Sequence, residues 1–331
     1  MTRGAPQGAA PPRPAAGGPG VRGLSALALA VAAAIALVAV PSALPGGGPG
    51  TEARGIDART LWSRVHVIGA SASAGFGVRA PVPRGSGIRP PALPLAKVAD
   101  LARLGDATVT GDATGLFFAD PCGTGTAQVD ATLEADPRPT IVLADDFLFW
   151  FTYGGLDAER KPIKDESQRL ALLERGLSQL DRLLDAGLRL VVGDVPDMSE
   201  SVGRMLTPRQ MPAPATLRAA NERIRAWAAS RPAAALLPLA ELVDDLRSGT
   251  PFTAGRREWS ERADGPLIQR DRLHPTFAGM VALLARTEQS ANERFLGAMQ
   301  PNAPGAPAAF EHDPAAVGDR VRESVAGASA P

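Results

Sequence analysis

The sequence predicts an α/β domain in which a mainly parallel sheet lies between two layers of helices. Two observations support this fold class. Short runs rich in Val and Ile alternate along the chain with longer segments in which apolar residues recur every three or four positions. In sheets of this kind ligands bind at the carboxyl ends of the strands, so the residues that follow each strand are the first candidates for a site.

Four buried strands are expected, each in a short apolar run that turn residues bound. The runs are RVHVIGA (64–70), PTIVLAD (139–145), LRLVVGDVP (188–196) and AAALLPLA (233–240). Continuous apolar runs of this length are typical of parallel strands that are covered on both faces.

Three helices are expected between and after these strands. The first begins after Asp165 and ends at Gly187, because leucines recur there at helical spacing and glycine commonly ends a helix. The second carries an apolar stripe of Leu217, Ala220, Ile224 and Trp227. The third covers residues 275–295, with Pro275 at its first helical position.

The two ends of the chain differ in composition from this central part, so we expect three parts: 1–56, 57–298 and 299–331. In the first part three arginines precede an uncharged apolar segment, residues 24–40, which is typical of an export signal or a membrane anchor. The positive-inside rule then places the rest of the chain outside the cytoplasm, in the periplasm or the extracellular space, cleaved or anchored to the cytoplasmic membrane. Pro, Ala and Gly dominate residues 299–331, which predicts a disordered tail.

Composition excludes several classes of function. Lys and Arg together number 35 and so do Asp and Glu, so no net field favours nucleic acid, and we expect no nucleic-acid partner. The single cysteine, Cys122, excludes an internal disulfide framework and a metal site built on several thiolates. We expect neither a metal ion nor an organic cofactor.

A serine in the glycine-rich stretch VIGASASAGFG (67–77) is a candidate nucleophile if the chain supplies a base. Of the three histidines, His66 lies within a predicted strand, where we expect a packed or edge side chain, and His312 lies in the predicted tail. His274 remains, three residues after Asp271 and just before a predicted helix. At this spacing a carboxylate lies close enough to hold the imidazole in one tautomer.

Two motifs in this order resemble those of the SGNH or GDSL hydrolase family: GASASAG (69–75) after the first strand and DRLH (271–274) before the last helix. The resemblance extends from about residue 60 to residue 297, and it implies a flavodoxin-like, five-stranded sheet. It also implies that Ser71 is the nucleophile, His274 the base and Asp271 the residue that orients the base. Ser73 fits the spacing less well.

The resemblance further implies an oxyanion hole. The backbone N–H of Ser71 would be one donor and a glycine of the second family block another; Gly111 and Gly115 are both available in TVTGDATGLFF (108–118), with Gly111 preferred. Where the family has a donor Asn, this chain has Asp145 and Asp146. Because an ionised carboxylate cannot donate a hydrogen bond, three alternatives are open for Asp146: it is held protonated, it orients a different donor, or the site is catalytically weak.

Five of the fifteen aromatic residues lie between positions 147 and 153. Two of them, Phe147 and Trp150, are candidates for a platform that binds an acyl or sugar group. The alternative is that these rings pack their loop onto the sheet.

The predicted function is an exported serine hydrolase that cleaves a carboxylic ester, from a small molecule or a polysaccharide, through an acyl-enzyme. Two alternatives remain. One is a non-catalytic binding or assembly protein of the cell envelope with the same fold. The other is an O-acyltransferase or deacetylase that acts on an envelope polysaccharide.

Overall fold

A computed structural model describes residues 56–81, 90–297 and 308–328. The chain divides into two units, residues 1–52 and 53–331, and all the described residues belong to the second. The predicted export or anchor segment, residues 24–40, lies outside the described residues. Within the described ranges no helix is both long and apolar enough to cross a bilayer.

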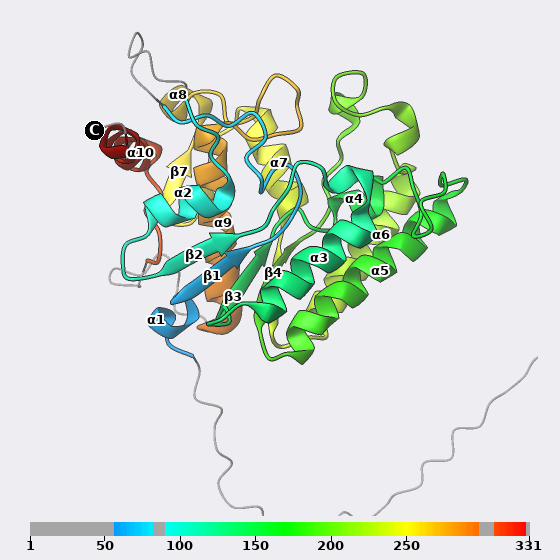
Figure 1. The fold of residues 1–331 in the computed structure, drawn as a ribbon. Helices are drawn as coiled ribbons and strands as arrows, with labels where there is room; N and C mark the ends of the chain where they lie inside the picture. Colours follow the sequence, from blue (N-terminus) through cyan, green and yellow to red (C-terminus); the bar gives the residue numbers. More distant parts are fainter. Residues whose placement is uncertain (1–55, 82–89, 298–307, 329–331) are drawn as a thin grey trace, which may run out of the picture. The chain divides into compact units, whose positions relative to one another are not determined.

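A five-stranded parallel sheet forms the centre of this unit, as the family resemblance implies; the apolar runs of the sequence predict four of its strands, all but Thr108–Gly111. Its order is β2-β1-β3-β4-β5, which is the flavodoxin-like order, and each neighbouring pair runs parallel (Figure 1). The strands are β1 (Arg64–Val67), β2 (Thr108–Gly111), β3 (Ile141–Ala144), β4 (Arg189–Gly193) and β5 (Ala234–Leu237). Every residue of the central strand β3 is buried, because the sheet is covered on both faces.

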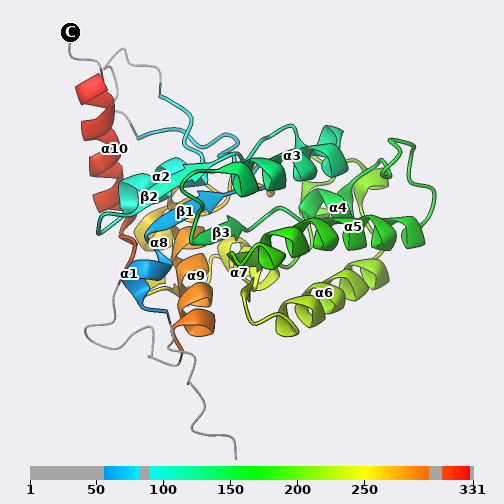
Figure 2. The ribbon, with the colours of Figure 1, turned by 60° about the horizontal axis from the view of Figure 1, so that its bottom comes forward.

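Helices cover the two faces of the sheet and complete the predicted α/β/α layers. On one face α3 (Pro121–Glu134), α5 (Glu166–Asp185) and α6 (Pro214–Ala229) lie side by side, while α2 (Leu95–Ala102) and α9 (Phe277–Phe295) cover the other (Figures 1 and 2). This division follows from right-handed crossovers between parallel strands.

Shorter elements fill the connections. After β5 the chain enters α7 (Leu239–Ser248), which packs against α9, so the last part of the run predicted as a strand to residue 240 is helical. A hairpin of β6 (Phe252–Ala254) and β7 (Arg257–Trp259) follows. The remaining elements are α1 (Ala58–Leu61), η1 (Phe117–Ala119), α4 (Phe149–Tyr153), η2 (Ser199–Ser201), η3 (Pro208–Gln210), α8 (Glu261–Asp264) and α10 (Pro314–Ala328).

Local chemistry explains where the long helices begin and end. The side chain of Asp165 caps α5 by accepting a hydrogen bond from Gln168 N at 3.0 Å, and Gly187 follows the helix with φ of 81°. Helix α9 begins two residues later than predicted. Its N-cap is Thr276, whose hydroxyl accepts from Gly279 N, and Pro275 therefore precedes the helix rather than opening it.

Residues 308–328 are folded, so the prediction of a disordered tail is wrong for this segment. Phe310 is fully buried with its ring edge-on to Trp62 at 5.2 Å. His312, which the sequence placed in the tail, is buried, and its Nε2 lies 2.8 Å from Glu288 Oε2 on α9. Helix α10 then packs against α2. A few well-placed side chains thus hold a segment whose overall composition predicts disorder.

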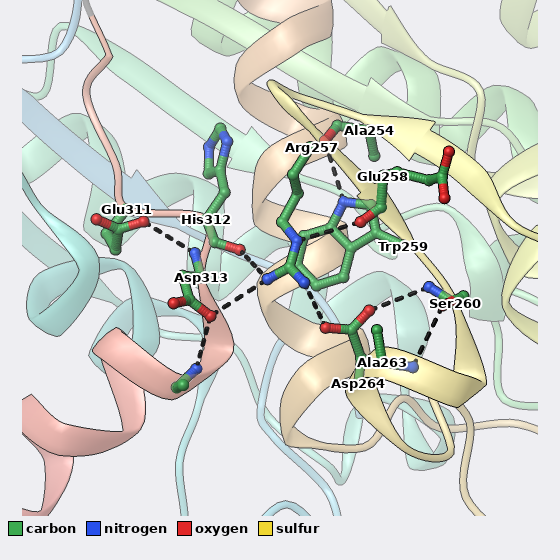
Figure 3. Close-up of polar contacts among 11 residues, drawn as sticks. Ala254, Arg257, Glu258, Trp259, Ser260, Ala263, Asp264, Glu311, His312 and Asp313 are labelled. Carbon is green, nitrogen blue, oxygen red and sulfur yellow. Dashed lines mark hydrogen bonds and ion pairs between the residues drawn. The ribbon is translucent and has the colours of Figure 1, made fainter.

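A polar cluster also joins this segment to β7 (Figure 3). Arg257 donates to the carbonyl of His312 and to the carboxylate of Asp313, both at 3.3 Å, and to the carboxylate of Asp264 at 2.5 Å. The same guanidinium lies 4.4 Å above the ring of Trp259. One arginine therefore connects the hairpin, α8 and the C-terminal segment.

We predict that Phe310→Ala lowers the free energy of unfolding by about 3 kcal/mol, since it deletes a fully buried aromatic side chain and leaves a cavity. Urea denaturation of the full chain measures the loss. Phe118→Ala is the matched control, because Phe118 is 47% exposed and should cost less than about 1 kcal/mol. Equal losses in the two variants would show that the C-terminal segment does not contribute to the core.

Candidate active site

Ser71, His274 and Asp271 form one continuous chain of hydrogen bonds. His274 Nε2 lies 2.8 Å from Ser71 Oγ, and His274 Nδ1 lies 2.8 Å from Asp271 Oδ2. Ser71 follows β1 and His274 precedes α9, so residues 203 positions apart meet at the carboxyl edge of the sheet. The Asp271 carboxylate can only accept a hydrogen bond, so the proton of the His274 ring lies on Nδ1. Nε2 then accepts a hydrogen bond from the serine hydroxyl.

A tight turn holds Asp271 and His274 together. The second carboxylate oxygen of Asp271 accepts from the backbone N–H groups of Leu273 at 2.9 Å and His274 at 3.0 Å. Arg272, between them, has φ of 61°, a conformation that is uncommon for a residue other than glycine. Burial by itself would raise the pKa of Asp271, but the hydrogen bonds from the His274 ring and from both N–H groups outweigh it and hold this pKa below its usual value. The carboxylate therefore stays ionised beside the imidazole.

The imidazole is shielded while the serine remains accessible. His274 is 1% exposed, and the ring of Phe76 lies against it with centroids 4.6 Å apart. Ser71 is partly exposed. Ser73, the other serine of the loop, is fully buried, and its hydroxyl donates to Asp146 at 2.6 Å. Only Ser71 of these two serines faces the histidine.

Asp146 binds the loop that carries Ser71 and does not act as a donor. Its Oδ1 accepts from Ala70 N at 2.9 Å and from the Ser73 hydroxyl, and its Oδ2 accepts from Ala72 N at 2.8 Å and Ser73 N at 3.3 Å. Both oxygens are thus occupied as acceptors, which disfavours the alternative in which a protonated Asp146 donates to an oxyanion. Of the three alternatives, the geometry favours the one in which Asp146 orients other donors.

The position of Asp146 requires glycine at position 69. A Cβ at Gly69, whose φ is 146°, would lie 2.3 Å from Asp146 Oδ1. Gln128 on α3 fixes the same residue, because its side chain accepts from Gly69 N at 2.9 Å and donates to Gly69 O at 3.0 Å. The sequence reasoning missed Gln128, since nothing in its neighbourhood marks it apart from an ordinary helical position.

The backbone N–H of Ser71 has no hydrogen-bond partner within the described part of the chain, whereas those of Ala70, Ala72 and Ser73 all donate to Asp146. This N–H is therefore free to donate to a ligand. Gly111 is the last residue of β2, in register with Val67, and it does not line the pocket beside Ser71. Its role as a second donor stays a prediction.

An apolar pocket opens beside Ser71 and His274. Phe149 and Met198 line one part of its wall, and apolar side chains of α7 line another. Phe147 does not reach this pocket, because it is fully buried against Phe117 at 5.3 Å between centroids. Trp150 is 6% exposed and does not line the pocket; its ring packs against Phe118 and against the pocket-lining Phe149. The expected platform of Phe147 and Trp150 is thus wrong; the alternative, rings that pack their loop onto the sheet, describes both.

Arg247 at the end of α7 connects three walls of this region. Its guanidinium donates to Asp197 O at 2.5 Å, contacts Met198 Sδ at 2.6 Å, and donates to Arg272 O at 2.6 Å. The carbonyl of Arg272 belongs to the turn that holds Asp271 and His274. The segment after β4, the pocket helix α7 and the histidine turn are therefore joined through one side chain, which no sequence motif indicated.

The other titratable candidates lie away from this site. His66 is 5% exposed on β1 and bonds Thr110 Oγ1 at 2.8 Å, as expected of a packed strand histidine; burial lowers its pKa although Asp112 opposes this. Burial also raises the pKa of the half-buried Cys122 thiol. Among the residues that the structure describes, no group of three or more His, Cys, Asp or Glu side chains is arranged to hold a metal ion.

Comparison with known proteins gives weak similarities. No protein-family model matches the chain, and no curated protein does. The crystal structure of TesA is 20% identical, covering 69% of this chain and 97% of that one, with a TM-score of 0.39. BT4096, a gut microbial diltiazem-metabolizing enzyme, is 13% identical, covering 67% of this chain and 45% of that one, with a TM-score of 0.40. The contacts of the chain's own residues therefore carry the functional assignment.

Asp145, next to Asp146, has a buried carboxyl group, and one of its two oxygens has no hydrogen-bond partner within the described residues. Thr287 on α9 donates to its Oδ2 at 2.8 Å, while its Oδ1 is buried without a partner. Burial raises its pKa to about 7; the Thr287 hydrogen bond opposes the rise and the neighbouring Asp146 adds to it. In the unfolded chain the same group releases its proton near the ordinary aspartate pKa of 3.8.

This difference predicts how stability depends on pH. Between about pH 4 and pH 7 the folded state retains a proton that the unfolded state loses, so the contribution of Asp145 to stability falls as pH rises and stays low above pH 7. Asp145→Asn removes the cost of ionisation and keeps an acceptor for Thr287. We expect it to raise the free energy of unfolding at pH 8 by on the order of 4 kcal/mol, and by little at pH 4. Urea unfolding at both pH values measures this; a pH-independent difference from the wild type would contradict it.

Proposed function

We propose that this chain is a serine hydrolase that cleaves a carboxylic ester. The observation that carries the proposal is the unbroken hydrogen-bond chain from Ser71 through His274 to Asp271, with both links at 2.8 Å. A serine hydroxyl is a poor nucleophile unless a base takes its proton, and a base acts best when a third group fixes its tautomer. This arrangement supplies both.

In the first half of the reaction Ser71 Oγ attacks the carbonyl carbon of the ester, and its proton passes to His274 Nε2. The imidazolium so formed is stabilised by the ionised Asp271 at Nδ1. When the tetrahedral intermediate collapses, the bond to the alcohol oxygen breaks and His274 returns the proton to that oxygen. The products are a free alcohol and an acyl group bound to Ser71.

In the second half water attacks the acyl carbon while His274 takes one of its protons. Collapse of this intermediate breaks the bond to Ser71 Oγ, which recovers the proton from His274. The carboxylic acid leaves, and the site returns to its starting state.

The negative charge that develops on the carbonyl oxygen needs a donor, and the free N–H of Ser71 is the one that we assign to it. Asp146 supports this donor indirectly, because it binds the neighbouring N–H groups and so directs the loop. Loss of one such donor typically lowers the rate by about 10² to 10³, so the position of this loop decides whether the site is active.

The N-terminal segment, residues 24–40, supports a location outside the cytoplasm, where the substrate would be a small-molecule or polysaccharide ester. Transfer of the acyl group to a sugar hydroxyl instead of water would use the same acyl-enzyme. Product analysis with a sugar acceptor present separates a transferase from a hydrolase.

We predict that Ser71→Ala abolishes labelling by a fluorophosphonate probe and lowers kcat on p-nitrophenyl esters by at least about 10³, because it removes the only group that forms the covalent intermediate. Gel fluorescence and initial rates measure the two effects, and an unchanged circular dichroism spectrum establishes that the variant is folded.

Ser73→Ala is the control within the same loop. Its hydroxyl is buried and donates to Asp146, so the variant should still be labelled at Ser71. Labelling that survives in Ser71→Ala would refute the assignment of the nucleophile. A folded wild-type chain that is never labelled and cleaves no ester would instead favour the non-catalytic alternative.

A further inference from the structure

The pocket beside Ser71 is mostly apolar. The polar side chains that line it are those of Ser71, Asp146 and His274, and the remaining lining residues are apolar. Helix α7 supplies the largest share of the wall, with four buried side chains: Leu239, Leu242, Val243 and Leu246. Ile268 and Leu273, from the segment before α9, close the opposite side. Such a cavity offers no partner to a charged or hydroxylated group, which would be costly to bury there.

The pocket is also small. Its cavity volume is about 40 Å³, which corresponds to about three or four water-sized groups. A methylene group is similar in size to a water molecule. The space therefore matches a short linear hydrocarbon chain better than a sugar ring.

The position of the pocket relative to the triad indicates which half of an ester it holds. The acyl part stays bound to Ser71 after the alcohol leaves, so the apolar pocket beside this serine is the place where it can remain. The alcohol must depart, and water must enter, on the open side, where Phe76 lies over His274 with 45% of its surface exposed. An apolar pocket next to the serine is thus suited to the acyl chain.

On the basis of the function proposed above, we propose that the α7 pocket selects esters of linear, uncharged acyl groups of about four to six carbons. Each additional methylene that enters the pocket should raise kcat/KM about fourfold until the pocket is full. An acetyl group leaves most of the cavity empty, and chains much longer than six carbons must leave the pocket or displace its wall. The substrate class is therefore a short-chain acyl ester rather than an acetylated polysaccharide.

The test is a series of p-nitrophenyl esters with acyl chains of two, four, six, eight and twelve carbons. We expect the full-length chain to show a maximum of kcat/KM at four to six carbons, at least tenfold above the acetyl ester. A profile that is flat, or highest for acetyl, would overturn the proposal.

Two variants examine the wall itself. Val243→Phe fills the cavity and should lower the ratio of hexanoyl to acetyl kcat/KM at least tenfold, whereas Leu246→Ala enlarges it and should move the maximum to longer chains. Asp244→Phe is the matched control, because it places the same ring on the exposed face of α7 and should leave the profile unchanged. If neither pocket variant alters the chain-length profile, the pocket does not hold the acyl group.

The outcome also separates this inference from the proposed function. Ser71-dependent labelling with a flat chain-length profile would refute the pocket assignment and retain the hydrolase. A folded wild type with no labelling and no ester cleavage would refute both.

Discussion

The geometry of the rest of the site depends on the carboxyl group of Asp146 and on the hydrogen bonds through which it holds the loop after β1. Three backbone N–H groups and one hydroxyl of that loop point at its two oxygens, and the N–H that is left over belongs to Ser71. In a loop that follows a parallel strand, the backbone N–H groups no longer pair with a neighbouring strand. A buried carboxylate that accepts hydrogen bonds from several of these groups therefore strongly stabilises one conformation of the loop. The direction of Ser71 is a consequence of this one hydrogen-bonding centre.

The same device recurs along the carboxyl edge of the sheet. Gln128 binds both backbone groups of Gly69, Asn221 does the same for Val195, and the Tyr153 hydroxyl donates to Pro196 O while accepting from Met198 N. In each case a buried side chain from a helix replaces the backbone partner that a regular strand would provide. Buried side chains thus satisfy backbone groups in three of the loops around the site, and the loop that carries Ser71 is one of them.

Much of the fold could be predicted because its signals lie in short stretches of the sequence. Strands such as 141–144 are continuous apolar runs, and α5 has an N-cap residue, an apolar stripe and a glycine after its last turn. The pairing of Asp271 with His274 was also local, and the partner serine was sought only within one glycine-rich turn.

The predictions that failed concern residues whose roles depend on their neighbours in the folded structure. Whether Asp146 donates or accepts is decided by which groups face it. Phe147 and Phe149 are two positions apart, and only the short helix α4 determines which of them lines the pocket. The C-terminal segment is held by the buried side chains of Phe310 and His312. The average composition of this Pro- and Ala-rich stretch does not reveal these two residues.

Arg247 links the wall of the pocket to the turn that holds His274. It lies on the helix that forms the pocket wall, yet it holds the carbonyl of Arg272 within the histidine turn. A shift of α7 along its axis would therefore pull on the turn that positions the base. The wall of the pocket and the alignment of the imidazole are then mechanically coupled. A substitution that reshapes the pocket by moving α7 would therefore also disturb the turn that holds His274, whereas one that only changes the volume of a side chain on α7 would leave that turn in place.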